Sequence, residues 1–135
     1  MIVVDTNVLA YYFAGFASPL ATAAIEWRQR DSAWRAPAFW RSEFRNVLAN
    51  YLRAKWMTPG VAAKIWREAD AAMAGGTLEV DAERVLALVA QSGCSAYDCE
   101  YVELAQRLGA PLLTADKKLI AAFPKICLQL TPLPT

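Results

Sequence analysis

The sequence of 135 residues contains no histidine, and this absence excludes several kinds of enzyme at once. Ser-His-Asp and Cys-His nucleophile systems, ribonucleases that use imidazole as acid and base, and the usual histidine-rich zinc sites all need that side chain. If the chain is an enzyme, its chemistry must therefore be carried by carboxylates or lysines.

Cysteines and long apolar runs are also scarce. The three cysteines, Cys94, Cys99 and Cys127, are odd in number and form no CxxC pair, so we expect packing residues rather than a disulfide framework or a zinc knuckle. No apolar stretch reaches the ~18 residues of a membrane-spanning helix, and the apolar start of the chain has no basic leader. We therefore expect a cytoplasmic protein that does not enter a membrane.

What the chain does contain is enough apolar material for one compact domain over residues 1–135. Hydrophobic residues make up 56% of the sequence and charged residues 20%, and strand-like stretches alternate with helical ones. Ser18-Pro19 and Thr58-Pro59 have the pattern of a capping residue followed by proline that begins helices. The alternation predicts an α/β fold, with helices on both faces of a parallel sheet of about five strands. The predicted strands are 2–4, 33–36, 77–80, 111–114 and 126–130.

Two aspartates lie at the ends of predicted strands. Asp5 follows the apolar run 2–4, and Asp116 follows the strand in PLLTAD. Ligands of such folds bind outside the carboxyl ends of the parallel strands, so both carboxylates are expected at that edge of the sheet. An equally good interpretation of either residue is the N-cap of the helix that follows it.

Two further acids lie on predicted helices. In WRSEFRNVLANYL, Glu43 falls one turn before Val47 on the apolar stripe, so it is predicted to face inward and to need a partner. The alternative is a position at the rim of the stripe, in reach of water or an arginine. In SAYDCEYVELAQRLG, Asp98 lies in the first turn at the border of the core, and Ser95 gives it the spacing of a capping box. The inward stripe of this helix is predicted to hold Tyr97, Tyr101, Leu104, Ala105 and Leu108, with Glu100, Glu103 and Arg107 on the opposite side.

Three stretches, VVDTNVLA, SEFRNVLANYLR and SAYDCEYVELAQRLGAPLLTADKKL, resemble in their order and spacing a PIN-domain ribonuclease of the VapC toxin type. The resemblance extends from near the first residue to about Leu130. It implies a PIN-like three-layer α/β/α sandwich with a central parallel sheet. Cys99 departs from the family pattern, in which an alanine is usual after the aspartate, but its side chain is small enough to leave Asp98 in place.

The resemblance also implies the activity, which is metal-dependent hydrolysis of phosphodiester bonds in RNA. One or two Mg²⁺ or Mn²⁺ ions would prefer oxygen ligands and would activate a water without any histidine. Thr6 and Thr114 are expected to orient carboxylates or a water, although a cap and a strand-end residue are equally good interpretations. The acids assigned to catalysis and metal binding are Asp5, Glu43, Asp98 and Asp116.

Partners are the remaining expectation. The sequence has 14 basic and 13 acidic residues, and nine acidic residues remain when these four are set aside. The surface beyond the site is therefore predicted to be mildly basic, as RNA binding requires. The resemblance implies a small antitoxin protein whose tail lies in a helical groove, and a homodimer or a toxin–antitoxin hetero-oligomer. Trp34 and Trp56 are candidates for a partner surface. The candidates for phosphate contacts are Arg28, Arg30, Arg35, Arg41, Arg45, Arg53, Lys117 and Lys118.

Other classes with an aspartate after the first strand fit the sequence less well. A phosphatase of the haloacid dehalogenase type requires DxDxT, whereas Asp5 is followed by Thr6 and Asn7. A receiver domain requires paired acids after the first strand and a phosphoacceptor aspartate after a central one. The serious alternative is a catalytically silent PIN-fold module that binds a protein or a nucleic acid.

Overall fold

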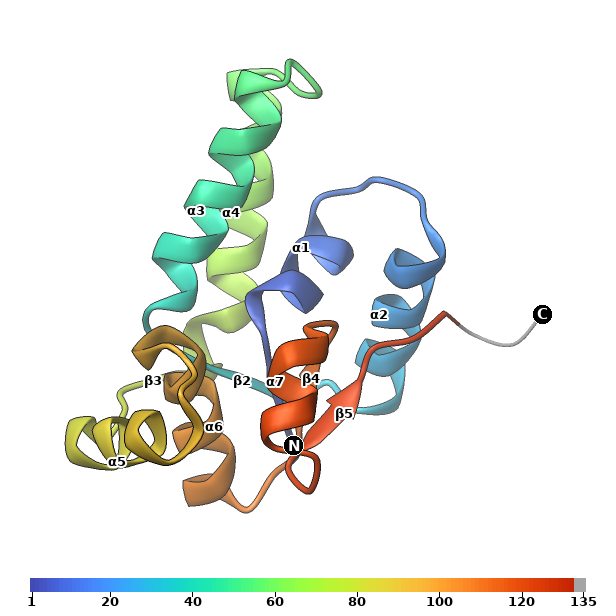
Figure 1. Ribbon diagram of the computed structural model, residues 1–135. Coiled ribbons are helices and arrows are strands. Elements are labelled where there is room, and N and C mark those ends of the chain that lie inside the picture. Colours follow the sequence, from blue (N-terminus) through green and yellow to red (C-terminus); the bar gives the residue numbers. More distant parts are fainter. Residues whose placement is uncertain (133–135) are drawn as a thin grey trace.

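The computed structural model describes residues 1–132. Its centre is a sheet of five parallel strands in the order β3-β2-β1-β4-β5 (Figure 1). All the predicted strands form, and the predicted parallel sheet is confirmed. β3 is shorter than expected, since it ends at Leu78. The strands are β1 (Ile2–Val4), β2 (Trp34–Pro37), β3 (Thr77–Leu78), β4 (Leu112–Thr114) and β5 (Cys127–Gln129).

Helices connect the strands and cover both faces of the sheet (Figure 1). Right-handed crossovers from β1 through β2 to β3 place α1 to α4 on one face, and the return from β3 to β4 and β5 places α5 to α7 on the other. The predicted three layers are thereby confirmed. None of the helices in the described part of the chain is long and apolar enough to cross a membrane. The helices are α1 (Thr6–Phe13), α2 (Pro19–Arg30), α3 (Trp40–Arg53), α4 (Pro59–Met73), the 3-10 turn η1 (Ala74–Gly76), α5 (Ala82–Ser92), α6 (Ala96–Leu108) and α7 (Lys117–Ala122).

The predicted helix starts are confirmed by their capping bonds. Ser18 Oγ accepts from the backbone N–H of Ala21 at 3.0 Å, and Thr58 Oγ1 accepts from that of Val61 at 3.3 Å. Each bond satisfies one of the N–H groups that a helix start leaves without a partner.

The two central strands are fully buried because helices cover both of their faces. Val3 and Val4 of β1 and Leu112 and Leu113 of β4 are inaccessible to solvent, and each such side chain contributes about 1.5–3 kcal/mol to stability. The three cysteines are free and buried, as expected. The polar residues that follow β1 and β4 are therefore attached to strands that packing holds rigidly in place.

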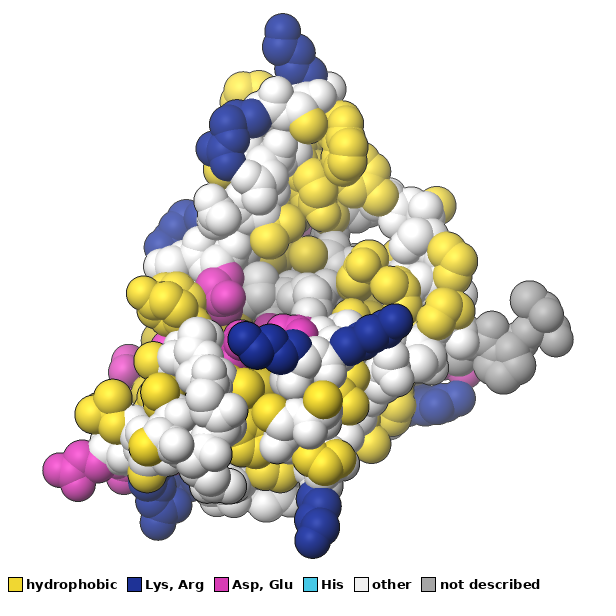
Figure 2. Space-filling model, viewed as in Figure 1, with side chains coloured by type: hydrophobic (Ala, Val, Ile, Leu, Met, Phe, Trp, Pro, Cys, Tyr) yellow, Lys and Arg dark blue, Asp and Glu magenta, His cyan; other side chains and the backbone are white. Residues whose placement is uncertain are grey.

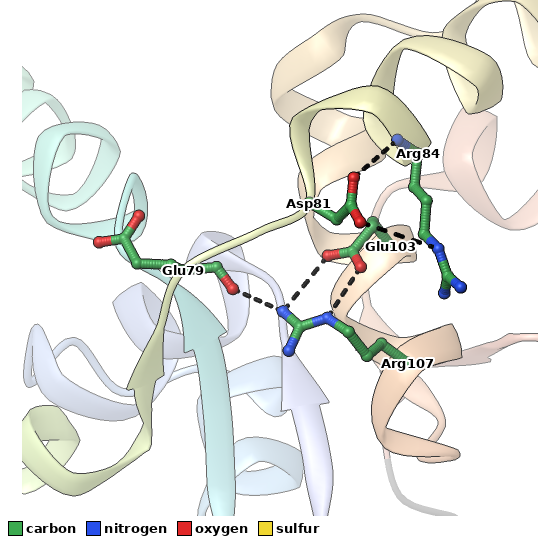
Figure 3. A network of polar contacts seen from close by, with 5 residues as sticks. All are labelled: Glu79, Asp81, Arg84, Glu103 and Arg107. Atoms are coloured by element: carbon green, nitrogen blue, oxygen red, sulfur yellow. Dashed lines mark hydrogen bonds and ion pairs between the residues drawn. The ribbon is translucent and has the colours of Figure 1, made fainter.

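The predicted orientation of α6 is wrong at Glu103, which is only 1% exposed. α6 packs against the sheet and also against α5, so it buries a wider arc than a single apolar stripe. Glu103 Oε1 accepts from Nε of Arg107 at 2.9 Å, and the same guanidinium donates to the carbonyl oxygen of Glu79 (Figure 3). The neighbouring Asp81 caps α5 through the N–H of Arg84. This network connects α6 to the segment that leads from β3 into α5.

Two aromatic side chains are also placed differently from expectation. Tyr97, in the first turn of α6, was predicted to face inward but is 57% exposed. It does not enter the core, and its ring stacks on that of Phe39. Trp34, predicted at a partner surface, is 2% exposed, with the guanidinium of Arg28 4.9 Å from its ring centroid. Trp56 is 65% exposed and stays a candidate for partner contact.

Candidate active site

The four acids singled out in the sequence line one pocket of about 300 Å³. Asp5 follows β1 and Asp116 follows β4, whereas Glu43 and Asp98 lie in the first turns of α3 and α6. Figure 2 shows acidic side chains gathered near the middle of one face of the molecule, with basic side chains beside them. The rest of the lining is Thr6, Asn7, Asn46 and Val47.

Asp5 is 7% exposed and is held by neutral donors alone. Its Oδ1 accepts from the backbone N–H of Thr6 at 2.7 Å, and its Oδ2 accepts from Oγ1 of Thr114 at 2.7 Å and from Nδ2 of Asn7 at 3.3 Å. None of the ion pairs formed within residues 1–132 includes Asp5. The carboxylate is therefore both the N-cap of α1 and part of the pocket wall, so the two interpretations of the sequence coexist.

Glu43 belongs to a compact group of three oxygens. Thr6 Oγ1 donates to Oε1 of Glu43 at 3.0 Å, the Tyr101 hydroxyl donates to the same oxygen at 2.5 Å, and the two hydroxyls are 2.5 Å apart. This arrangement fixes the direction in which the carboxylate points. Tyr101 was expected as a core residue only. A buried tyrosine hydroxyl usually has a hydrogen-bond partner. This rule could have indicated from the sequence that Tyr101 contacts a polar group.

Thr114 connects the two strand-end aspartates. Its hydroxyl oxygen accepts from the backbone N–H of Asp116 at 3.0 Å while it donates to Asp5. Asn7, which sequence reasoning did not select, accepts from the N–H of Ala115 at 3.2 Å and so holds the same turn. The contacts expected of Thr6 and Thr114 with acids are present, and their role in orienting a metal or a water stays a prediction.

Asp98 and Asp116 also take part in helix capping. The N–H of Asp98 donates to Oγ of Ser95 at 3.1 Å, which is the serine half of the predicted capping box. Asp116 Oδ1 accepts from the N–H groups of Lys118 and Leu119 at 2.9 Å and 3.3 Å, at the start of α7. Capping therefore holds the side chain of Asp116 and the backbone of Asp98 at the edge of the pocket.

Burial and mutual repulsion make the charged forms of Asp5, Glu43 and Asp98 costly. Burial raises the pKa of Asp5 to about 6, against the opposing hydrogen bonds from Thr114 and Thr6, and the charges of Glu43 and Asp98 raise it further. The pKa of Glu43 is raised by burial and by the charge of Asp98. The pKa of Asp98 is raised by burial and by the charge of Asp116, and the charge of Lys118 partly offsets the rise. The pocket thus lacks positive charge relative to its acids.

The donor set fits a hard divalent cation. Four carboxylates and the hydroxyl of Thr6 supply the oxygen ligands that Mg²⁺ and Mn²⁺ prefer, and about 300 Å³ leaves room for an ion that keeps several waters. The acids, however, are not already closed around one point: within residues 1–132 no three acidic or cysteine side chains are arranged to hold an ion. Binding would need the side chains to rotate or waters to bridge them to the ion.

Several basic candidates for phosphate contact are engaged elsewhere. Arg30 pairs with Glu26 and Arg41 with Asp70. Lys118 differs from them, because its charge acts on Asp98 at the rim of the pocket.

Comparison with known proteins decides the family. The family model of the PIN domain matches residues 2–125. The chain belongs to the PIN domain family. PIN domains are generally nucleases, and the acidic pocket lies where this parallel sheet places its ligand crevice. No protein with a curated description matches the sequence.

Three solved structures share this PIN fold at low sequence identity. PAE2754 from Pyrobaculum aerophilum has a TM-score of 0.75 and 20% identity over 96% of this chain and 83% of its own. FitAcB from Neisseria gonorrhoeae has a TM-score of 0.67 and 20% identity over 98% of both chains. A toxin–antitoxin complex from Klebsiella pneumoniae has a TM-score of 0.64 and 18% identity over 100% of both chains. At these identities the likeness is one of fold.

Proposed function

We propose that this PIN domain, a single domain over residues 1–135, is a metal-dependent endoribonuclease of the cytoplasm and the toxin of a toxin–antitoxin pair. The observation that carries the proposal is the pocket in which Asp5, Glu43, Asp98 and Asp116 meet without ion-pair partners within residues 1–132. Membership of a family of nucleases supports the hydrolysis of phosphodiesters. The fold shared with a chain of a toxin–antitoxin complex supports the biological role.

In the proposed mechanism each side chain has a limited task. Asp5 and Asp98, with Glu43 and Asp116 beside them, would hold one or two Mg²⁺ or Mn²⁺ ions in the pocket. Bound metal supplies a water of lowered pKa and stabilises the charge that grows on the phosphate.

The neighbouring groups orient the acids and the substrate. Tyr101 and Thr6 keep Glu43 in one orientation, and Thr114 and Asn7 do the same for Asp5. Lys118, at the rim, attracts a substrate phosphate.

The proposed antitoxin has a suitable surface about two helical turns along α3 from Glu43. Phe16, Tyr51 and Trp56 line an apolar hollow of about 290 Å³, which α1 and α3 both help to form. The Tyr51 and Trp56 rings stack with centroids 5.7 Å apart. We assign this surface to an apolar segment of the antitoxin and expect the toxin to form a homodimer or a hetero-oligomer with it.

The first experiment separates an enzyme from a silent module. Purified protein is incubated with a panel of single-stranded RNAs in chelator, Mg²⁺ or Mn²⁺, beside Asp98→Asn and the control Glu68→Gln, which removes an exposed acid of α4. The expected result is cleavage that requires metal, is lost in Asp98→Asn and is kept in Glu68→Gln. Binding of RNA without cleavage under all conditions would establish the silent module instead.

A second experiment tests the partner. A short reading frame beside the gene is expected to encode a protein that copurifies with the chain and suppresses cleavage. Trp56→Ala should weaken that association and leave metal-dependent cleavage intact. If no reading frame of that kind suppresses cleavage, the chain is a nuclease that acts alone.

A further inference from the structure

A second hollow of about 220 Å³ lies on the α5 and α6 side of the acidic pocket. Val80, Val85 and Leu86 form apolar walls, and Tyr97 and Glu100 of α6 complete the lining with an aromatic face and a carboxylate. We call this hollow the α5–α6 pocket. It takes no part in the chemistry described above.

The α5–α6 pocket and the acidic pocket share no lining residue, but their linings adjoin at Tyr97 and Asp98. Tyr97 immediately precedes Asp98 in the chain. Its ring stacks on that of Phe39, one helical turn before Glu43, with centroids 4.6 Å apart and planes 12° apart. Phe39 therefore fixes the orientation of Tyr97, and the exposed part of Tyr97 is left for another flat group. Figure 2 shows hydrophobic side chains directly beside acidic ones over the lower end of α3.

Glu100 gives the pocket a polar group that no neighbour uses. The side chain is partly buried, and it lies close enough to Glu43 for the two charges to repel each other. None of the hydrogen bonds or ion pairs found within residues 1–132 involves its carboxylate. Glu103, one turn further along α6, differs in being paired with Arg107. Glu100 therefore presents two free acceptor oxygens at the edge of an apolar hollow.

We propose that the α5–α6 pocket binds one base of single-stranded RNA next to the phosphate held by the acids, and that it prefers guanine. This inference rests on the proposed nuclease function. A base is joined to its phosphate through one sugar, so a phosphate at Asp98 brings a base within reach of Tyr97. Aromatic stacking is the common means of binding an unpaired base in RNA-binding proteins.

The preference for guanine follows from Glu100. The Watson–Crick edge of guanine presents two adjacent N–H donors, which match the two oxygens of a carboxylate. Adenine and cytosine place an acceptor nitrogen beside their single amino group, and uracil has one N–H between two carbonyl groups. An apolar peptide or a second copy of the chain would bury Glu100 without such donors, which costs free energy. The lining therefore favours a base over a hydrophobic partner.

The test compares matched RNAs. A uridine tract with one central guanosine is compared with the same tract carrying inosine, which lacks only the 2-amino group, and kcat and KM are measured in Mn²⁺. We expect kcat/KM to favour guanosine by on the order of tenfold, since a site built for a donor rejects the analogue that lacks it. Glu100→Gln should bring the guanosine-to-inosine ratio to about one. Glu83→Gln, an exposed acid of α5, is the matched control and should keep the parent ratio.

Tyr97 is tested through the split between kcat and KM. Tyr97→Ala should raise KM for the guanosine RNA about tenfold with a smaller effect on kcat, and Tyr97→Phe should restore the parent KM. An unchanged guanosine-to-inosine ratio in Glu100→Gln would overturn the inference. A change from dimer to monomer in Tyr97→Ala, measured by sedimentation, would overturn it too, because the surface would then be an interface between copies.

Cleavage and binding measurements test the nuclease function and the base-binding pocket separately. If no RNA is cut in any metal, the nuclease proposal fails. Fluorescence anisotropy of the same RNAs in chelator still tests the α5–α6 pocket: tighter binding of guanosine than of inosine, lost in Glu100→Gln, supports it, and equal binding contradicts it.

Discussion

Two acidic side chains are buried within residues 1–132 of this PIN domain, and only one of them is paired with a cation. Glu103, 1% exposed, accepts a hydrogen bond from Arg107 at 2.9 Å, so a cation one turn away balances its charge (Figure 3). Asp5, 7% exposed, has neutral donors only, and the charges of Glu43 and Asp98 raise its pKa in addition to the larger effect of burial. Burial of an acid is therefore no sign of a functional site by itself. The sign is a buried acid without a counter-charge from the chain.

The difference has an energetic meaning. A buried ion pair has its own compensation, and removing one partner leaves the other uncompensated. A group of like charges lowers the stability of the fold until a cation binds to it. A cation bound there therefore raises the free energy of unfolding. The Glu103 network is therefore expected to serve folding, and the acidic pocket to serve binding and chemistry.

The largest effect that separates the two regions is expected in activity. Asp116→Asn should reduce metal-dependent RNA cleavage by on the order of a hundredfold or more, because the remaining acids hold the ion and its water poorly. The double variant with Asp98→Asn should lose little more, since the acids act as one unit. Initial rates per folded molecule are the measurement. Glu103→Gln should keep the parent rate, and an equal loss there would show that the two regions do not differ.

The second largest difference between the two regions is expected in how stability depends on pH. The pKa of Asp5 is about 6 in the folded protein and 3.8 in its unperturbed form. The protonated group therefore contributes stability that is fully present below pH 3.8 and is lost as the pH rises through 6. Over that window, in chelator, the unfolding free energy of the parent should fall by up to about 3 kcal/mol relative to Asp5→Asn. Urea unfolding at pH 4 to 7.5 measures this. A parent that gains stability relative to the variant would contradict the assignment.

Metal should reverse the strain in one region only. At a Mn²⁺ concentration about 100 times Kd, the unfolding free energy of the parent should rise by about 2.7 kcal/mol. Thermal unfolding in chelator and in Mn²⁺ gives the shift. Asp98→Asn should lose most of it, whereas Glu103→Gln should keep it in full. A full Mn²⁺ shift in Asp98→Asn would remove this residue from the metal site.

The smallest effect is expected in the paired region. Glu103→Gln should destabilise the fold by about 1–2 kcal/mol, with or without metal, because a charge-assisted hydrogen bond becomes a neutral one. Arg107 is 38% exposed and stays hydrated, which limits the loss. A double-mutant cycle with Arg107→Gln, measured by urea unfolding, isolates the coupling. Absence of coupling would show that the two side chains are stabilised independently.

The sequence was sufficient for the features that depend on local patterns. The strand ends that carry Asp5 and Asp116 follow directly from apolar runs, and the helix starts at Ser18 and Thr58 from capping chemistry. That the four acids share one pocket followed from a parallel sheet and from the family resemblance together. These features need only the neighbours in the chain and one general rule about α/β sheets.

The features that sequence reasoning missed depend on packing between distant segments. A single apolar stripe describes a helix with one buried side, but α6 is covered by the sheet and by α5, which buries Glu103. Tyr101 was expected inside, yet its bond to Glu43 joins residues 58 positions apart. Tyr97 is exposed and stacks on Phe39, which immediately precedes α3. Periodicity within one helix contains none of this information.

The central position of β1 has a consequence for synthesis. β1 leaves the ribosome before the other four strands of the sheet, but the hydroxyl that holds Asp5 belongs to Thr114, 109 positions later. A chain still being made has the first acid of the pocket without its support and without the last acid, Asp116. The proposed nuclease activity therefore arises only after β4 and the turn that carries Asp116 have been synthesised. Prematurely terminated chains that lack β4 and α7 are expected to be harmless to the cell that makes them.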